Sequence, residues 1–303
     1  MMDEYVVSVI SNMGMISFLA LSAYMLLLTG EISFGQQAYF AISAYLSAMA
    51  TAMWGWPLWA GLLLGAAAAA FAAGLIGVLT LRLRGLYFSI ATLAFAEMVR
   101  LLFVNFHYQV MIDGEPVGPD GAEGFRDIRW IFEHNVSAFE YMAIILAVLT
   151  VVVTLFFIAE RSRLGSIFRM LGEDPLLTEL QGLNVIRYKV LASCLSGFIA
   201  GIGGAFYAHF ATYLEPQIFN VMLGVHGLVY GLIGGLGTAL GPLIGVALDI
   251  GFLEAVRAIQ GYRMVVFGGL VAVLLIFMPR GILDEERVHW LRMTWRRWRN
   301  AAR

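Results

Sequence analysis

The chain has 303 residues, of which 60% are hydrophobic and only 13% are charged, and its formal net charge at pH 7 is -2. Water-soluble domains carry roughly 25% charged residues, so this composition, with a mean hydropathy of +0.81, excludes a soluble globular protein and indicates that the fold faces lipid. The near-neutral charge also excludes a nucleic-acid-binding protein, which needs a basic face.

Apolar stretches of about the length needed to cross a bilayer follow one another along the chain. Nine of them run over residues 5–28, 37–53, 57–79, 87–106, 139–158, 188–210, 221–236, 242–259 and 264–278. We therefore predict an all-α, polytopic integral membrane protein with about nine transmembrane helices, within a range of eight to ten. Residues 1–303 are expected to form a single transmembrane domain. The first stretch follows an acidic start rather than a basic one, so we expect it to be a retained span and not a signal peptide.

Glycines are unusually dense between Gly224 and Gly245, where Gly235 and Gly237 lie close together and Pro242 follows. Such density predicts broken or re-entrant helices near residues 224–245. Backbone groups freed by these breaks must be buried in protein or line a cavity, because lipid cannot hydrogen-bond them.

The distribution of arginine and lysine predicts the orientation in the membrane. If the C-terminus is cytoplasmic, fourteen of the 19 basic residues fall in inner segments and four in outer ones. We therefore predict an N-terminus outside, a cytoplasmic C-terminus and an odd number of spans.

This orientation predicts the side of the membrane on which three polar segments lie. Residues 107–138 are acidic and rich in turn formers, and we predict an extracytoplasmic loop there. Residues 160–187 are interrupted at 172–175 and 182–184, which predicts two short helices in a structured cytoplasmic loop that has a partner. The basic cytoplasmic tail, 280–303, interleaves tryptophans with arginines and suits a helix lying among the inner lipid headgroups; an unstructured basic end is the alternative.

Motifs for catalysis and cofactor binding are missing. A P-loop needs Gly-Lys-Ser/Thr, and the single lysine of the chain, Lys189, lies between Tyr188 and Val190. The five histidines are far apart in the sequence, and Cys194 is the one cysteine, so neither a zinc motif nor an intrachain disulfide is present. We expect no catalytic residue, no metal and no cofactor, and so no enzyme.

Charged residues inside the predicted spans are expensive and therefore informative. Glu97 and Arg100 lie three residues apart on one helix face, where they can neutralise each other or belong to a gate or substrate path. Asp249 has no basic residue within one helical turn, so it either faces a watery path or pairs across helices.

Several of these segments together resemble one protein family. The segments are Thr-Gly-Glu-Ile-Ser-Phe-Gly-Gln-Gln-Ala at 29–38, Leu-Arg-Leu-Arg-Gly-Leu-Tyr-Phe-Ser-Ile-Ala-Thr-Leu-Ala-Phe-Ala-Glu at 81–97 with Arg100, and 118–125, 173–174, 187–189, 234–237, 241–242 and 279–281. In this order they resemble the LivM-type permease subunits of ABC importers for branched-chain amino acids.

The resemblance implies a transmembrane permease domain in the cytoplasmic (inner) membrane that relies on separate subunits for ATP hydrolysis. Its expected partners are a second, LivH-like permease subunit, two cytoplasmic ATP-binding subunits that power transport, an extracytoplasmic substrate-binding protein and membrane lipid. Residues 160–187 then correspond to the loop that couples the permease to an ATPase.

The resemblance also suggests residues for the two tasks of such a subunit. ATPase coupling falls to Arg169, Glu173, Asp174, Glu179 and Gly182. At Gly182 a side chain would block either a close approach or a turn that needs positive φ. The translocation pathway is expected to include Ser33, Gln36, Gln37, Glu97, Arg100, Gly235, Gly237 and Asp249.

Other functions stay open at this level. Members of the family usually have a histidine where this chain has Gln36-Gln37, so a urea or short-amide permease of the same superfamily is one alternative. An ion-coupled secondary transporter that uses Asp249 or Glu97 is another, although it would not need a structured coupling loop. An intramembrane enzyme would need a nucleophile and a base, and the sequence offers no such pair.

Overall fold

The computed structural model describes residues 4–80, 83, 85–112, 114–253, 262–278 and 281–284, and most of these residues are helical. The long helices are α1 (Glu4–Leu27), α2 (Gln36–Ala52), α3 (Leu58–Thr80), α4 (Leu86–Val104), α6 (Ala138–Glu160) and α9 (Val185–Ala211). The C-terminal part has shorter elements: the 3-10 turn η2 (Pro216–Phe219), α10 (Val221–Gly234), α11 (Leu240–Val246), the π-helical η3 (Ala247–Leu253) and α12 (Arg263–Phe277).

Five of these helices, α1, α3, α4, α6 and α9, are long and apolar enough to cross a membrane. The chain is therefore a polytopic membrane protein, as predicted. Helix α2 has 17 residues and α10 has 14, and α11 with its π-helical extension and α12 are also apolar but short. A helix needs about 20 residues to cross the hydrocarbon core, so the total of nine spans stays a prediction.

Helix α9 lies at the centre of the bundle and packs against α1, α2 and α3. Small residues make this packing close: a Cβ on Gly201 would lie 2.7 Å from the Cα of Ala66 in α3. Hydroxyl groups add hydrogen bonds between helices, with Ser43 donating to the carbonyl of Gly201 at 2.6 Å. Such stripes of small residues let membrane helices approach one another in place of a hydrophobic driving force.

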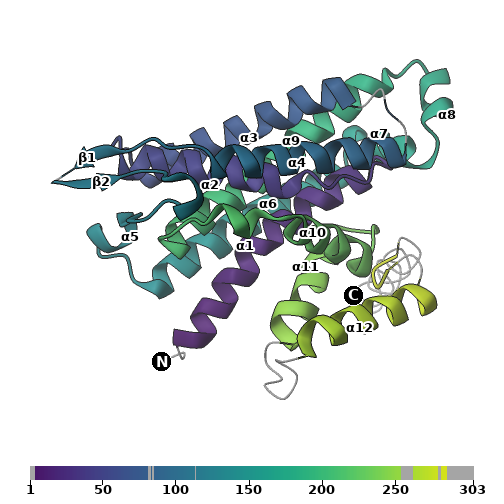
Figure 1. Cartoon of the computed structure of the whole chain (residues 1–303). Helices are drawn as coiled ribbons and strands as arrows, with labels where there is room; N and C mark the ends of the chain where they lie inside the picture. Colours follow the sequence, from purple (N-terminus) through teal and green to yellow (C-terminus); the bar gives the residue numbers. More distant parts are fainter. Residues whose placement is uncertain are drawn as a thin grey trace, which may run out of the picture.

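Two groups of short elements lie at opposite ends of the bundle (Figure 1). One end carries the hairpin β1 (Val110–Ile112) and β2 (Glu115–Val117), the 3-10 turn η1 (Gly121–Glu123) and α5 (Trp130–Glu133). The other end carries α7 (Arg163–Glu173) and α8 (Pro175–Leu180), in the segment for which two short helices were predicted. The segments 107–138 and 160–187 therefore lie at opposite ends of the bundle, and their sides of the membrane stay a prediction. Most of the predicted basic tail, 280–303, falls outside the described residues.

The glycine-rich segment separates α10 from α11. Helix α10 ends at Gly234, and Gly235 has a φ of +93°. Residues 281–284 pair with this break, because Leu283 donates its N–H to the Gly234 carbonyl at 2.8 Å and accepts from the Gly237 N–H at 3.0 Å. The backbone groups freed by the break are therefore satisfied by protein rather than by water in a cavity.

Candidate transport and coupling sites

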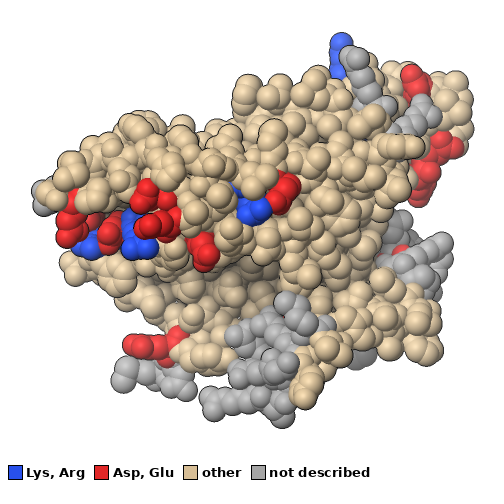
Figure 2. All heavy atoms as spheres, in the orientation of Figure 1, with Lys and Arg blue, Asp and Glu red and all other residues tan. Residues whose placement is uncertain are grey.

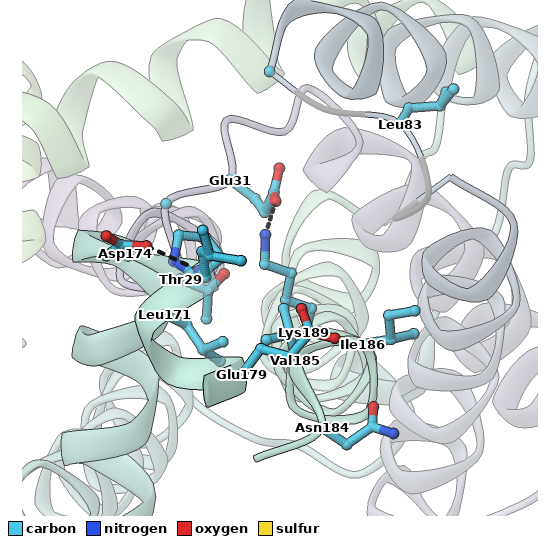
Figure 3. Close-up of a pocket in the computed structure, with 15 residues that line it drawn as sticks. Thr29, Glu31, Leu83, Leu171, Asp174, Glu179, Asn184, Val185, Ile186 and Lys189 are labelled. Atoms are coloured by element: carbon cyan, nitrogen blue, oxygen red, sulfur yellow. Dashed lines mark hydrogen bonds and ion pairs between the residues drawn. The ribbon is translucent and has the colours of Figure 1, made fainter. Parts of the chain in front are cut away.

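A cavity of about 710 Å³ opens where the end of α1 meets α7, α8 and the start of α9. Within it, the ammonium of Lys189 and the carboxylate of Glu31 form an ion pair (Figure 3). Their side chains are only 12% and 7% exposed, respectively. The pair ties the irregular segment between α1 and α2 to the first turns of α9. Sequence reasoning missed it, although a lone lysine beside a predicted span was a signal that could have been followed.

The turn between α7 and α8 is held against the end of α1. A Cβ on Gly172 would lie 2.5 Å from the carbonyl oxygen of Leu28, so only glycine fits this approach. Asp174 then starts α8, because its Oδ1 accepts the N–H groups of Leu176 and Leu177 at 2.9 and 3.1 Å. A side-chain cap of this kind satisfies donors that the first helical turn leaves free.

The residues predicted for ATPase coupling differ in where they point. Glu173 and Glu179 are exposed, whereas Asp174 is engaged as the cap of α8. Gly182 is exposed with a φ of +83° and no atom near its missing Cβ, so the turn explains this glycine and a close approach does not. Arg169 turns toward the glycine-rich break, where it donates to the Gly237 carbonyl at 3.3 Å.

Helix α8 presents an apolar surface with acidic neighbours. Leu176, Leu177 and Leu180 are 66%, 58% and 76% exposed. These three leucines together with Glu173 and Glu179 are called the α8 surface below. It lies at the end of the bundle that carries α7 and α8 (Figure 1), where a partner protein can reach it.

Glu160, the last residue of α6, joins several elements and was also missed from the sequence. Its Oε1 accepts the hydroxyl of Tyr24 at 3.0 Å and the N–H of Ala239 at 2.7 Å, and its Oε2 accepts the hydroxyl of Thr238 at 3.4 Å. An acid at the C-terminal end of a helix opposes the helix dipole, which is a sequence signal that such a residue has donors elsewhere. Glu160 thus connects α1 and α6 to the break before α11.

Buried amides mark the start of α2. Gln36 and Gln37 are each 1% exposed, and among the described residues the Gln36 Oε1 and both amide atoms of Gln37 find no hydrogen-bond partner. The Gln37 amide packs directly on Gly224 of α10, at the place that a Cβ would fill. Nearby, Ser33 accepts the Gly35 N–H at 3.1 Å and is also buried.

Glu97 and Arg100 of α4 form the ion pair that their spacing allows. The Arg100 NH2 and the Glu97 Oε1 are 2.5 Å apart, and the Arg100 Nε lies 3.0 Å from the Glu97 Oε2. A third group joins them, because the Arg100 NH1 donates to the Gln217 Oε1 of η2 at 2.7 Å. Nothing in the sequence pattern pointed to Gln217.

Asp249 lies in the π-helical segment and pairs across helices. Its Oδ2 accepts the hydroxyl of Tyr230 in α10 at 2.5 Å, and the residue is 4% exposed. The Tyr230 ring stacks on His226, with ring centroids 5.9 Å apart. Asp249 therefore makes a contact across helices, and its place on the translocation pathway stays a prediction.

The residues expected on the translocation pathway occupy four separate places. These are the start of α2, the surface of α4, the break between α10 and α11, and the π-helical segment. Gly235 and Gly237 lie against the backbone of residues 283–284, so their role in this conformation is close packing. Among the described residues, no group of three His, Cys, Asp or Glu side chains is placed to hold a metal ion.

Comparison with known proteins assigns the chain to a family. The model of the branched-chain amino acid transport system / permease component family matches residues 5–279. The chain belongs to this family. It is 29% identical over 280 residues to the high-affinity branched-chain amino acid transport system permease protein LivM of Salmonella typhimurium, and equally to LivM of Escherichia coli.

These alignments cover 86% of this chain and 65% of each LivM protein, so the chain spans less than two thirds of those relatives. The corresponding permease protein LivH of Escherichia coli is 25% identical over 183 residues, which are 55% of this chain and 59% of LivH. No solved structure matches the chain.

Proposed function

We propose that this chain is the membrane-spanning permease subunit of an ABC importer that translocates branched-chain amino acids across the cytoplasmic (inner) membrane. The family match over residues 5–279 carries the proposal. The proposed partners are a second permease resembling LivH, two cytoplasmic ATP-binding subunits that hydrolyse ATP, and an extracytoplasmic substrate-binding protein. In this arrangement the N-terminus lies outside, the segment 107–138 faces the binding protein and the basic tail is cytoplasmic.

The coupling role belongs to residues 160–187. The exposed leucines of the α8 surface support this role, because a cluster of large apolar side chains in a cytoplasmic loop is typical of a protein interface. Behind this surface, Arg169 reaches the Gly237 carbonyl and Glu160 receives the N–H of Ala239. Motion of α7 and α8 is thereby passed to the break between α10 and α11, which is a junction of the kind that can rearrange between two states.

The translocation role belongs to the region where α2 meets α10. A buried amide without a partner costs about 1–3 kcal/mol, and a purely structural role does not account for Gln36 and Gln37. These amides gain partners when α2 and α10 separate and a polar substrate passes between them. The short α10, reached through the irregular residues 212–220, supports a re-entrant arrangement in this part of the chain.

Energy source and substrate are tested together in proteoliposomes that contain the whole transporter and its binding protein. Uptake of labelled L-leucine is expected to require ATP on the side of the membrane that carries the ATP-binding subunits. It should persist when ion gradients are collapsed. A transporter whose ATP-binding subunits lack their P-loop lysine is the matched control and should be inactive. Uptake that follows an ion gradient without ATP would establish the secondary transporter instead. Competition by urea or acetamide, with none by isoleucine and valine, would establish the amide permease.

A further inference from the structure

The ion pair of α4 is partly exposed on a helix that otherwise belongs in lipid. Helix α4 is one of the five candidate spans, and Glu97 and Arg100 are its charged residues. The Glu97 side chain is 39% exposed and that of Arg100 is 15% exposed. Figure 2 shows one acidic and one basic group side by side within an uncharged surface, apart from the charged cluster at the β1–β2 end. Glu97 lies seven residues, about 10 Å, before the end of α4.

Lipid is an unfavourable neighbour for this face. An ionisable group at the membrane centre costs about 2.5–3.5 kcal/mol on insertion scales, and pairing removes only part of that cost while the groups stay exposed. A pair with a structural role alone would be expected between packed helices, as Tyr230 and Asp249 are. Gln217 adds a third polar group from another element. We therefore expect the surface around Glu97 to face water or polar groups in the assembled transporter.

We propose that Glu97, Arg100 and Gln217 form a binding station for the zwitterionic head of an α-amino acid on the translocation pathway. The α-carboxylate of the substrate binds the Arg100 guanidinium, and the α-ammonium binds the Glu97 carboxylate. This inference rests on the proposed function and names the part of the substrate that the permease recognises.

The chemistry of the site fits a zwitterion better than a single charge. The Arg100 NH2 and Nε donate to the two Glu97 oxygens, and the Arg100 NH1 donates to Gln217. Planar guanidinium groups bind carboxylates through two parallel hydrogen bonds. A zwitterion can replace the internal pair with two new pairs, so the site stays neutral throughout. A simple anion or cation would leave one protein charge unpaired.

The surrounding surface suggests how the two ends of the substrate are arranged. Ala94 and Leu101 lie three residues before and four residues after Glu97, on the same face of α4, and both are exposed. They offer an apolar surface for an aliphatic side chain beside the charged station. The station itself binds the α-ammonium and α-carboxylate that all α-amino acids share, so it does not discriminate among their side chains.

Protection of an introduced cysteine tests the proposal directly. Ala94 is exposed one turn before Glu97, and Cys194 is the one native cysteine. Ala94→Cys is placed in a Cys194→Ala background, and the whole transporter is purified without its binding protein. The rate of labelling by a thiol reagent is measured with L-leucine, with isoamylamine, which lacks the carboxylate, or with 4-methylpentanoate, which lacks the ammonium.

L-leucine is expected to slow labelling about tenfold at millimolar concentration, and the amine and the acid are expected to have little effect. Arg100→Gln should abolish the protection. The charge-swapped variant Glu97→Arg/Arg100→Glu keeps an ion pair at the same spacing and is expected to restore thermal stability without restoring full ATP-driven uptake. Met98→Leu is a conservative control at an exposed position of α4 outside the station, and it should behave as the parent does.

Three outcomes would overturn the inference. They are equal labelling with and without L-leucine, equal protection by all three compounds, and normal uptake by the charge-swapped variant. If any of these occurs while ATP-driven uptake by the parent transporter is intact, the binding station fails and the proposed function stands. Loss of ATP dependence in the parent itself would instead refute the proposed function.

Discussion

The buried pair between Glu31 and Lys189 provides the sharpest quantitative prediction. Breaking a buried ion pair by removing one partner costs about 3–5 kcal/mol, because the remaining charge stays buried without compensation. The adjoining cavity of about 710 Å³ admits water to this charge, so we expect the lower end of that range. Glu31→Gln and Lys189→Met should each lower the free energy of unfolding by about 3 kcal/mol, a change of more than a hundredfold in the equilibrium constant.

The double variant separates this cause from a general packing defect. Glu31→Gln/Lys189→Met leaves no unpaired charge, and replacing both members of a buried pair is often close to neutral. We therefore expect the double variant to recover at least half of the stability that either single variant loses. Because each single variant loses about 3 kcal/mol and the double variant at most about half of that, the coupling energy from the double-mutant cycle should be at least about 4 kcal/mol in magnitude.

Denaturant-induced unfolding in detergent micelles, followed by tryptophan fluorescence, gives the free energy of unfolding. It is measured for the parent, the two single variants and the double variant. Arg129→Met provides the control, because it breaks the exposed pair with Asp127, and exposed pairs contribute little to stability. Its unfolding midpoint should be nearly unchanged. A coupling energy below about 0.5 kcal/mol between Glu31 and Lys189 would refute the assignment of a buried, energetically significant pair.

Four further variants test the connections around this end of the bundle and its opposite end. Glu160→Gln keeps the shape of the side chain but weakens charge-assisted hydrogen bonds of about 1.5–3 kcal/mol, and it should lower the amount of amino acid transported per ATP hydrolysed; an unchanged ratio would remove Glu160 from coupling. Gly172→Leu should destabilise the chain by about 1–3 kcal/mol through overpacking, because its Cβ would lie 2.5 Å from a carbonyl oxygen at the end of α1. Gly182→Ala should cost only about 1–2 kcal/mol through its left-handed backbone, and thermal melting in detergent should rank the two glycine variants in this order. Ala122→Cys in a Cys194→Ala background places a thiol in the exposed η1 turn, and an impermeant reagent should label it in intact cells; labelling only after permeabilisation would reverse the proposed orientation.

The ion pair of α4 shows how far sequence reasoning reached toward the candidate sites. Two opposite charges three residues apart in an apolar stretch indicated that Glu97 and Arg100 can neutralise each other, because helical geometry alone brings them together. Their contact with Gln217 depends on η2 folding back against α4, and no local pattern encodes that approach. The same holds for Glu160, whose partners come from α1 and from the segment before α11.

The sequence by itself determined the solvent, the class of fold and the family. Apolar runs of bilayer length predict helices because each helix satisfies its own backbone hydrogen bonds, and among the described residues five helices are long and apolar enough to cross a membrane. The breaks between α7, α8 and α9 were also readable, because glycine, proline and helix-capping residues act locally. Only the tertiary structure decided that Glu31 meets Lys189 and that residues 281–284 close the break after α10. It also decided that Gln37 packs without a polar partner on Gly224. These contacts join residues far apart along the chain, and in a membrane protein their positions follow from how small residues let the helices approach rather than from any periodic signal in the sequence.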